Sequence, residues 1–271
     1  MKKYTLLTFF ALLLSTTLLL AQHREVRNVE NFTKISFGFP GKLYLKQGSP
    51  QKVELEGDKD VLEEVETDVE GSSLKIRKEG KWFDWNFDDD KITVYITMPN
   101  IEGVSVSGSG NVIGQSKIKT EDLDLNVSGS GSLSLEVDAS GDIETDVSGS
   151  GDIDLKGRCK SFNSDVSGSG KVTLSATIDN RATFGVSGSG KIEASGSAEN
   201  VKASINGSGK VLAADLQTNR CEIRISGSGD VEINVKNELD ANISGSGSVT
   251  YKGNPNKVNS HASGSGKVRK M

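Results

Sequence analysis

The sequence predicts an all-β fold: a right-handed parallel β-helix, or solenoid, built from coils of about 20 residues. Three observations predict it: a tripeptide repeated at nearly constant spacing, strict alternation of apolar and polar residues around it, and an excess of glycine over proline. The chain has 271 residues, with 31 Gly and 4 Pro, and 34% of them are apolar. This composition is unlike that of a membrane-embedded protein or a conventionally packed helical enzyme.

The first 21 residues are expected to form a secretory signal peptide. Lys2 and Lys3 precede an apolar run at residues 6–20, and Ala21 follows at a position suited to cleavage. The run is shorter than a transmembrane helix requires, so no integral membrane segment is expected after cleavage, and an uncleaved anchor is the alternative. We therefore expect an exported protein of the periplasm, the cell surface or the extracellular space.

Residues 22–103 form an N-terminal region that lacks the tripeptide but also has the pattern of β structure. This region is expected either to start the solenoid or to cap its first coil. Residues 60–66 are expected to form a short helical or irregular bridge. Strands are expected at residues 32–39, 42–46, 53–55, 74–77 and 92–97, between turn signals rich in Gly, Pro and Ser.

Residues 104–271 contain nine Gly-Ser-Gly tripeptides whose first glycines are 18 to 21 residues apart. A flexible linker would not recur at such constant spacing with constant flanks. The residues two before and four after the first glycine are apolar in every copy, and polar residues lie between them. This alternation predicts strands with one buried and one exposed face. One such coil buries too little to be stable alone, so the coils are expected to stack.

The tripeptide glycines share the alternation phase of the buried positions. We expect a corner of the coil there, where an inward Cβ would collide or a positive φ is required. The structural repeat glycines are Gly108, Gly110, Gly129, Gly131, Gly149, Gly151, Gly168, Gly170, Gly188, Gly190, Gly207, Gly209, Gly227, Gly229, Gly245, Gly247, Gly264 and Gly266.

The serines beside and between these glycines are expected to point outward and to form ladders. Two interpretations fit them: short polar side chains that tolerate a tight corner, or a flat hydroxylated strip that binds glycan or ice. Examples are Ser107, Ser128, Ser148, Ser167 and Ser187, with Ser109, Ser130, Ser150, Ser169 and Ser189 between the glycines.

Histidine and cysteine offer no catalytic constellation. The chain has only His23 and His261, which does not support a nucleophile triad or a histidine zinc site. Cys159 and Cys221 lie about three coils apart, beyond the Cα separation that a disulfide spans, and Cys221 falls in an inward column. We expect both thiols to be unpaired and neither to be catalytic.

Carboxylates need separate attention because β-helical glycosidases and lyases use them. Asp152 and Asp230 follow the tripeptide, but the same position in other copies holds Asn, Ser or Lys, which is typical of a solvated face. The sequence therefore predicts no enzyme activity, no cofactor and no metal site. The formal net charge of −5 gives no electrostatic reason to bind nucleic acid.

The one local anomaly is residues 81–91, which hold both tryptophans and three consecutive acids. The aromatics share one strand face, so they either cover the end of the core or form an exposed patch for a glycan or a protein. A cation site at the three acids is the third interpretation, and it would need further oxygen ligands. The candidate binding residues are Trp82, Phe83, Trp85, Phe87, Asp88, Asp89 and Asp90.

Several motifs together resemble a known family. They are the recurring Val-Ser-Gly-Ser-Gly units, the stretch Asn31-Phe-Thr-Lys-Ile with the later Leu43-Tyr-Leu-Lys-Gln-Gly, and Ile96-Thr-Met-Pro-Asn-Ile running into Val106. This combination resembles the autotransporter adhesin, head GIN-domain family of exported proteins from Bacteroidetes-type bacteria. The resemblance covers nearly the whole chain after residue 21. It implies a β-helical fold and a surface or adhesive role, and it offers no catalytic residues to carry over.

Three functional hypotheses follow. The favoured one is an exported, non-catalytic adhesion or interaction module of the cell surface or envelope that binds a glycan or a surface protein. The alternatives are a structural component of the envelope or matrix, which would self-associate at the coil ends, and a carbohydrate-active β-helix enzyme, which would need a cleft lined by carboxylates.

Overall fold

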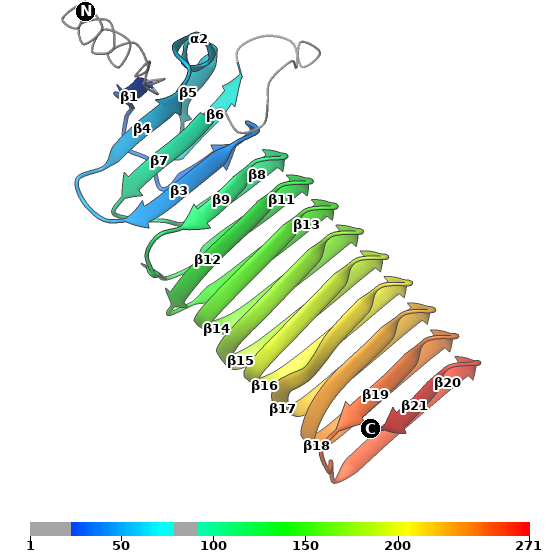
Figure 1. Ribbon diagram of the computed structural model, residues 1–271. Coiled ribbons are helices and arrows are strands. Elements are labelled where there is room, and N and C mark those ends of the chain that lie inside the picture. The colour runs from blue at the N-terminus through cyan, green and yellow to red at the C-terminus, as the bar shows by residue number, and fades with distance from the viewer. Residues whose placement is uncertain (1–22, 79–91) are drawn as a thin grey trace, which may run out of the picture.

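The computed structural model describes residues 23–78 and 92–271. The expected signal peptide and the candidate residues Trp82, Phe83, Trp85, Phe87, Asp88, Asp89 and Asp90 lie outside the described residues. The described chain forms a β-solenoid of stacked parallel coils, as the sequence predicts (Figure 1).

Each coil is flattened into two strands, one that leads into a tripeptide and one that leaves it. We call the sheet of leading strands the incoming sheet and the other the outgoing sheet. The incoming sheet contains β8 (Gly103–Gly108), β11 (Leu123–Gly129) and β13 (Asp142–Gly149), and the outgoing sheet contains β9 (Asn111–Gly114) and β12 (Ser132–Ala139). The short β10 (Ile118–Thr120) pairs with the end of β12.

Later coils join the two sheets at the corner opposite the tripeptide. There, one long strand serves first the outgoing and then the incoming sheet. These strands are β14 (Asp152–Gly168), β15 (Lys171–Gly188), β16 (Lys191–Gly207), β17 (Lys210–Gly227) and β18 (Asp230–Gly245), followed by β19 (Ser248–Lys252) in the outgoing sheet, β20 (Lys257–Gly264) in the incoming sheet and β21 (Lys267–Lys270) in the outgoing sheet.

Equivalent residues of successive coils stack in register, which builds the core from columns. Val106, Val127, Val147 and Val166 lie beside one another on neighbouring strands, and each is 1% exposed. Their stacking removes a continuous apolar ladder from water, which no single coil could do alone. Cys159 and Cys221 are buried and unpaired, so the expectation of two free thiols is confirmed.

The two glycines of a tripeptide meet different requirements. Gly149 has a φ of +114°, and a Cβ there would lie 2.7 Å from the carbonyl oxygen of Gly129 in the coil before. Gly151 has no positive φ, but its Cβ would lie 2.4 Å from Cγ1 of Val127 in the core. The second glycine is buried, whereas the first is only partly buried. The first needs glycine both for its backbone conformation and for the close approach of the preceding coil, and the second needs it for space in the core.

The N-terminal region extends the solenoid out of sequence order. The strands β2 (Lys34–Phe37) and β3 (Lys42–Gln47) pair in parallel with β8 and β9 and so form the preceding coil. The later strands β6 (Ser73–Lys78) and β7 (Ile92–Met98) stack outside β2 and β3. A segment that comes later in the sequence therefore lies farther from the repeats.

Antiparallel strands then close this end. The strand β5 (Val65–Glu70) pairs with β6, β4 (Lys52–Gly57) pairs with β7, and β1 (His23–Arg27) pairs with β4. The short helix α2 (Lys59–Glu63) joins β4 to β5 and buries Val61 and Leu62. A short helical or irregular bridge was expected at residues 60–66; the helix is present, but Val65 and Glu66 begin β5, and neither β5 nor β1 was predicted. Both strands carry mostly polar side chains because they pair at the edge of the fold.

Candidate functional site: the incoming face

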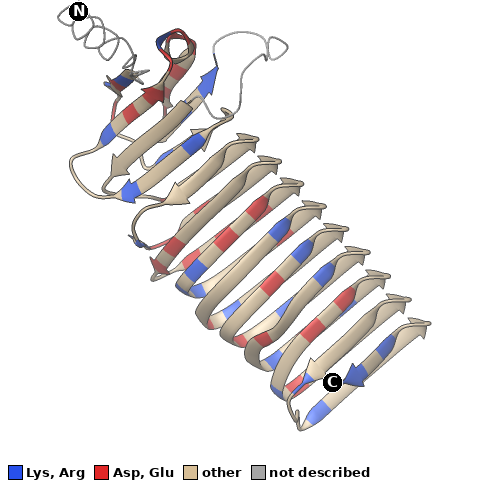
Figure 2. Cartoon of the chain, viewed as in Figure 1, with Lys and Arg blue, Asp and Glu red and all other residues tan. Residues whose placement is uncertain are grey.

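The outer surface of the incoming sheet, which we call the incoming face, presents four columns of outward side chains. They come from the positions one, three, five and seven residues before the first glycine, because side chains of a strand alternate between faces. The column next to the tripeptide is almost entirely serine, and its members pair in register from strand to strand. The predicted serine ladder is thus present, and Figure 2 shows the strand tips at the tripeptide edge without charged residues. The members of this serine column are Ser107, Ser128, Ser148, Ser167, Ser187, Asn206, Ser226, Ser244 and Ser263.

A shallow groove of about 750 Å³ runs beside this ladder across β14 to β18 and β20. It is lined by the serine column, by the column three residues before the first glycine, and by the apolar residues between these columns, which are Val166, Val186, Ile205, Ile225 and Ile243. The column three residues before the first glycine contributes the chemically varied groups: Asp165, Ser204, Arg224, Asn242 and His261. Hydroxyl, amide, carboxylate, guanidinium and imidazole groups therefore face one elongated surface, and all of them can bond hydroxyl groups of a ligand.

Gly185 deepens the groove. It lies between Asp165 and Ser204 in the same column, and a Cβ built there would lie 1.9 Å from Oδ1 of Asp165. The Asp165 carboxylate thus occupies the space that a side chain at position 185 would need. This glycine is outside the tripeptide and has no positive φ, so its role is to make room on the surface.

An acidic band crosses the incoming face on β11, β13 and the incoming part of β14. Asp146 lies directly across from Asp165, and its carboxyl pKa is raised, first by burial and then by the charges of Glu144, Asp165 and Asp124. Lys34 forms an ion pair with Asp124 at 3.1 Å. The outward positions of these strands hold no base, and their acids are Asp122, Asp124, Asp142, Glu144, Asp146 and Asp165.

A basic band follows on β15, β16 and β17. Arg181, Lys202 and Arg220 line a second hollow of about 620 Å³, together with Arg224 and Glu222 of β17 and with Glu238 and Asp240 of β18. Arg224 forms an ion pair with Glu222 at 2.7 Å. Within the described part of the chain, Arg181, Lys202 and Arg220 form no ion pair and no side-chain hydrogen bond. The incoming face thus changes from a band of acids on β11, β13 and β14 to a band on β15 to β17 in which bases outnumber acids.

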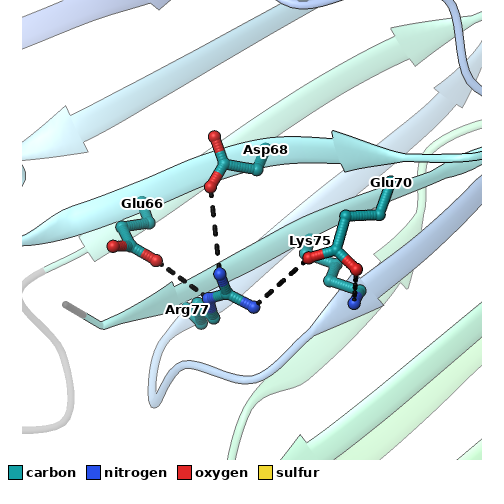
Figure 3. Close-up of polar contacts among 5 residues, drawn as sticks. All are labelled: Glu66, Asp68, Glu70, Lys75 and Arg77. Atoms are coloured by element: carbon teal, nitrogen blue, oxygen red, sulfur yellow. Dashed lines mark hydrogen bonds and ion pairs between the residues drawn. The ribbon is translucent and has the colours of Figure 1, made fainter. Parts of the chain in front are cut away.

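The N-terminal end of the same face shows that adjacent strands can pair their charges here. Arg77 of β6 lies 2.8 Å from Glu66, 3.9 Å from Asp68 and 3.7 Å from Glu70 of β5, and Lys75 also bonds Glu70 (Figure 3). These contacts raise the pKa of Arg77, chiefly through its hydrogen bond to Glu66. Arg181, Lys202 and Arg220 of the basic band form no such contact within the described residues.

The outgoing face provides an internal comparison in the same coils. Its lysines Lys171 and Lys191 each lie 3.2 Å from Glu193, and Lys210 lies 3.5 Å from Asp230. The hydrogen bond from Lys171 is the main cause of a lowered pKa at Glu193. Asp152 and Asp230 thus belong to a face whose charges are of both signs, as the sequence suggested.

Comparisons with known proteins place the chain in a family. The family model described as "Putative auto-transporter adhesin, head GIN domain" matches residues 31–194 and 178–255. The chain belongs to this family. No curated protein matches it.

Solved structures share the fold of this head GIN-domain protein. A "putative adhesin" from Parabacteroides distasonis ATCC 8503 has a TM-score of 0.70 and 21% identity, over 92% of this chain and 96% of that one. A "Putative lipid binding protein" from the same organism has a TM-score of 0.67 and 24% identity over the same shares. A "putative adhesin" from Parabacteroides merdae ATCC 43184 has a TM-score of 0.64 and 22% identity, over 92% of this chain and 95% of that one.

The structure of this head GIN-domain protein brings together residues that sequence reasoning did not single out. Ser167 and Ser187 of the expected serine ladder line the groove, and His261, for which no role was predicted, is exposed at its end. Arg181, Lys202, Arg220, Gly185 and Asp165 were missed. The sequence contains a signal for them, because alignment of the outward positions of the repeats on the tripeptide separates repeats rich in acids from repeats rich in bases.

Metal-binding clusters and membrane-spanning helices are both absent from the described residues. No group of three or more His, Cys, Asp or Glu side chains there has an arrangement that could hold a metal ion. No helix in residues 23–78 and 92–271 is long and apolar enough to cross a membrane.

Proposed function

We propose that this protein is an exported, non-catalytic adhesion module whose incoming face binds an extended surface polymer. The observation that carries the proposal is the groove, because it continues over six coils and is lined by hydrogen-bonding groups with little side-chain bulk. Such a surface can make the same contact repeatedly along a chain-like partner, and repeated weak contacts add up to stable binding. Membership of an adhesin family supports the same role.

The test compares adhesion after blocking either face. Ser204→Tyr places a bulky side chain in the groove, whereas Ser175→Tyr places the same side chain at an exposed outward position of the outgoing sheet. We expect Ser204→Tyr to reduce binding to immobilised glycans and cell surfaces and Ser175→Tyr to leave it unchanged. Equal binding by both variants and the unchanged protein would refute the assignment of the incoming face.

The aromatic and acidic segment at residues 81–91 is proposed as a second contact region. It follows β6 and precedes β7, and Lys78 and Ile92 lie beside strand ends at the tripeptide edge, next to the incoming face. Its proposed ligand-binding residues remain Trp82, Phe83, Trp85, Phe87 and Asp88 to Asp90. Changing Trp82 and Trp85 to Ala is expected to reduce glycan or cell binding, and unchanged binding would remove this region from the proposal.

A further inference from the structure

We propose that the partner of the incoming face is an anionic polysaccharide, held by Arg181, Lys202 and Arg220. The inference rests on the proposed function and names the ligand class of that same surface. These three bases lie on the adjacent strands β15, β16 and β17 and line one hollow of about 620 Å³.

The first argument is that Arg181, Lys202 and Arg220 form no ion pair in the described chain. Three acids also line the hollow, and each has another partner: Glu222 is paired with Arg224 at 2.7 Å, Glu238 is paired with Lys257 at 2.8 Å, and Asp240 accepts a hydrogen bond from Asn242 at 2.9 Å. Arg220 lies across from Glu238 and, after Lys257, helps to lower the pKa of that carboxyl without forming an ion pair with it. The four bases of the hollow outnumber its three acids, so an anionic partner is attracted to the bases that lack an ion pair.

The second argument is the absence of apolar anchors from the outward positions of the incoming strands β15 to β18, where the most apolar side chain is that of Thr183. Among the described residues, the exposed large apolar side chains are those of Val26, Val258 and Met271, which lie outside these four strands. A protein interface concentrates its affinity in buried aromatic and apolar anchors, and insertion into a membrane surface needs an apolar face. A hydrated polyanion needs only cations and hydrogen-bonding groups, and this surface provides both.

The third argument is the placement of the hydroxyl strip. Arg224 and Asn242 belong to both hollows, so the basic band is continuous with the groove of serines and amides. Neighbouring strands are about 4.8 Å apart, so the bases recur along the axis on the scale of single sugar units. The acidic band on β11 to β14 would repel a polyanion and thereby confine it to β15 and the strands that follow.

The experiment uses polymers with one backbone and different charge: neutral dextran, carboxymethyl dextran and dextran sulfate. We expect the protein to be retarded in native gels containing either anionic dextran but not in gels containing neutral dextran, and the retardation to fall as salt is raised. The test variant is Arg181→Gln with Lys202→Gln and Arg220→Gln. The matched control, Lys171→Gln with Lys191→Gln and Lys210→Gln, removes three charges from the outgoing face at nearby coils.

We expect the test variant to lose about tenfold or more in affinity for the anionic dextrans and the control to change by less than about twofold. Far-UV circular dichroism confirms that both variants fold, which surface substitutions of this kind permit. Equal losses in the two variants would show an effect of net charge alone and overturn the proposal.

Two other outcomes would also overturn it. If soluble polyglutamate binds through these bases and the anionic dextrans do not, the partner is an acidic protein. If sedimentation shows that the test variant only loses self-association, the occupant is the acidic band of a second copy. Absence of binding to anionic dextrans, with adhesion still blocked by Ser204→Tyr, would refute this inference and leave the proposed function standing.

Discussion

Substitution of tripeptide glycines by alanine separates the two physical requirements at the corner. Gly108 and Gly149 occupy the same position of the repeat and have φ values of +86° and +114°. A Cβ at Gly108 has no heavy atom within 4 Å, whereas a Cβ at Gly149 lies 2.7 Å from the carbonyl oxygen of Gly129. The two variants therefore share the backbone strain, and only the second adds a collision between coils.

The magnitudes follow from this difference. An alanine held in the left-handed region costs roughly 1 to 2 kcal/mol, so Gly108→Ala is expected to lower the free energy of unfolding by about that much. Forcing an extra carbon against backbone adds typically about 1 to 3 kcal/mol, so Gly149→Ala is expected to lose about 2 to 5 kcal/mol in total. Gly151→Ala tests the collision without the strain, because its φ is not positive and its Cβ would meet Val127.

Urea unfolding followed by far-UV circular dichroism measures these losses. Ser150→Ala, between two of the glycines, is the control and is expected to change the free energy of unfolding by less than about 0.5 kcal/mol, because its side chain is on the surface. Equal losses for Gly108→Ala and Gly149→Ala would refute the reasoning, since the approach of successive coils would then contribute nothing. A loss confined to the slope of the transition would instead show that the coils no longer unfold together.

Three further predictions concern buried and crowded groups. Ser164 is fully buried with its hydroxyl unbonded, so Ser164→Ala is expected to raise the free energy of unfolding by about 1 kcal/mol in urea titration, and a loss of stability would contradict this. Burial raises the thiol pKa of Cys159 to about 12 and also raises the thiol pKa of Cys221, so above pH 9 the folded state keeps both protons while the unfolded state loses them. The free energy of unfolding is therefore expected to fall above pH 9 by up to about 1.4 kcal/mol per pH unit for each thiol. Replacing both cysteines by Ala should abolish this contribution to the pH dependence. The raised pKa of Asp146 means that its negative charge opposes folding. Asp146→Asn is therefore expected to raise the thermal midpoint of unfolding at pH 7 and to diminish the increase in that midpoint on mild acidification. A lower midpoint in this variant would count against the acidic band as a source of repulsion.

The repeated part of the fold could be predicted from sequence because its inward positions leave little choice. Val127, Val147 and Val166 must each fill the same column, and each is 1% exposed, so the alternation can be recognised in a single sequence. The tripeptide corner can be recognised for the same reason, since every coil meets its neighbour at the same glycines. What the alternation could not reveal is that the first glycine is needed for its φ as well as for space, whereas the second is needed for space alone.

The N-terminal end could be predicted only in part. Strands such as β3 and β7 alternate clearly, and they were expected close to their actual positions. The strand β5, with the sequence VETDVE, buries only Val65 fully and is held by ion pairs to β6, which leave no periodic apolar signal. The stacking of β6 and β7 outside β2 and β3 depends on long-range pairing that no local pattern contains.

The candidate site was hidden for the opposite reason from the core. Outward positions carry no packing constraint, so their residue types vary from coil to coil, and such variation resembles an ordinary solvated face. The structure changes this interpretation by showing which charges are satisfied. In these coils the outgoing lysines Lys171, Lys191 and Lys210 lie within 3.5 Å of an acid, whereas Arg181 and Lys202 on the incoming face form no ion pair within the described chain. Both faces are built by the same repeat and meet the same solvent, so the fold itself does not require this difference. The anionic partner proposed above would account for it, and that is why the incoming face, and not the outgoing one, is where binding should be measured first.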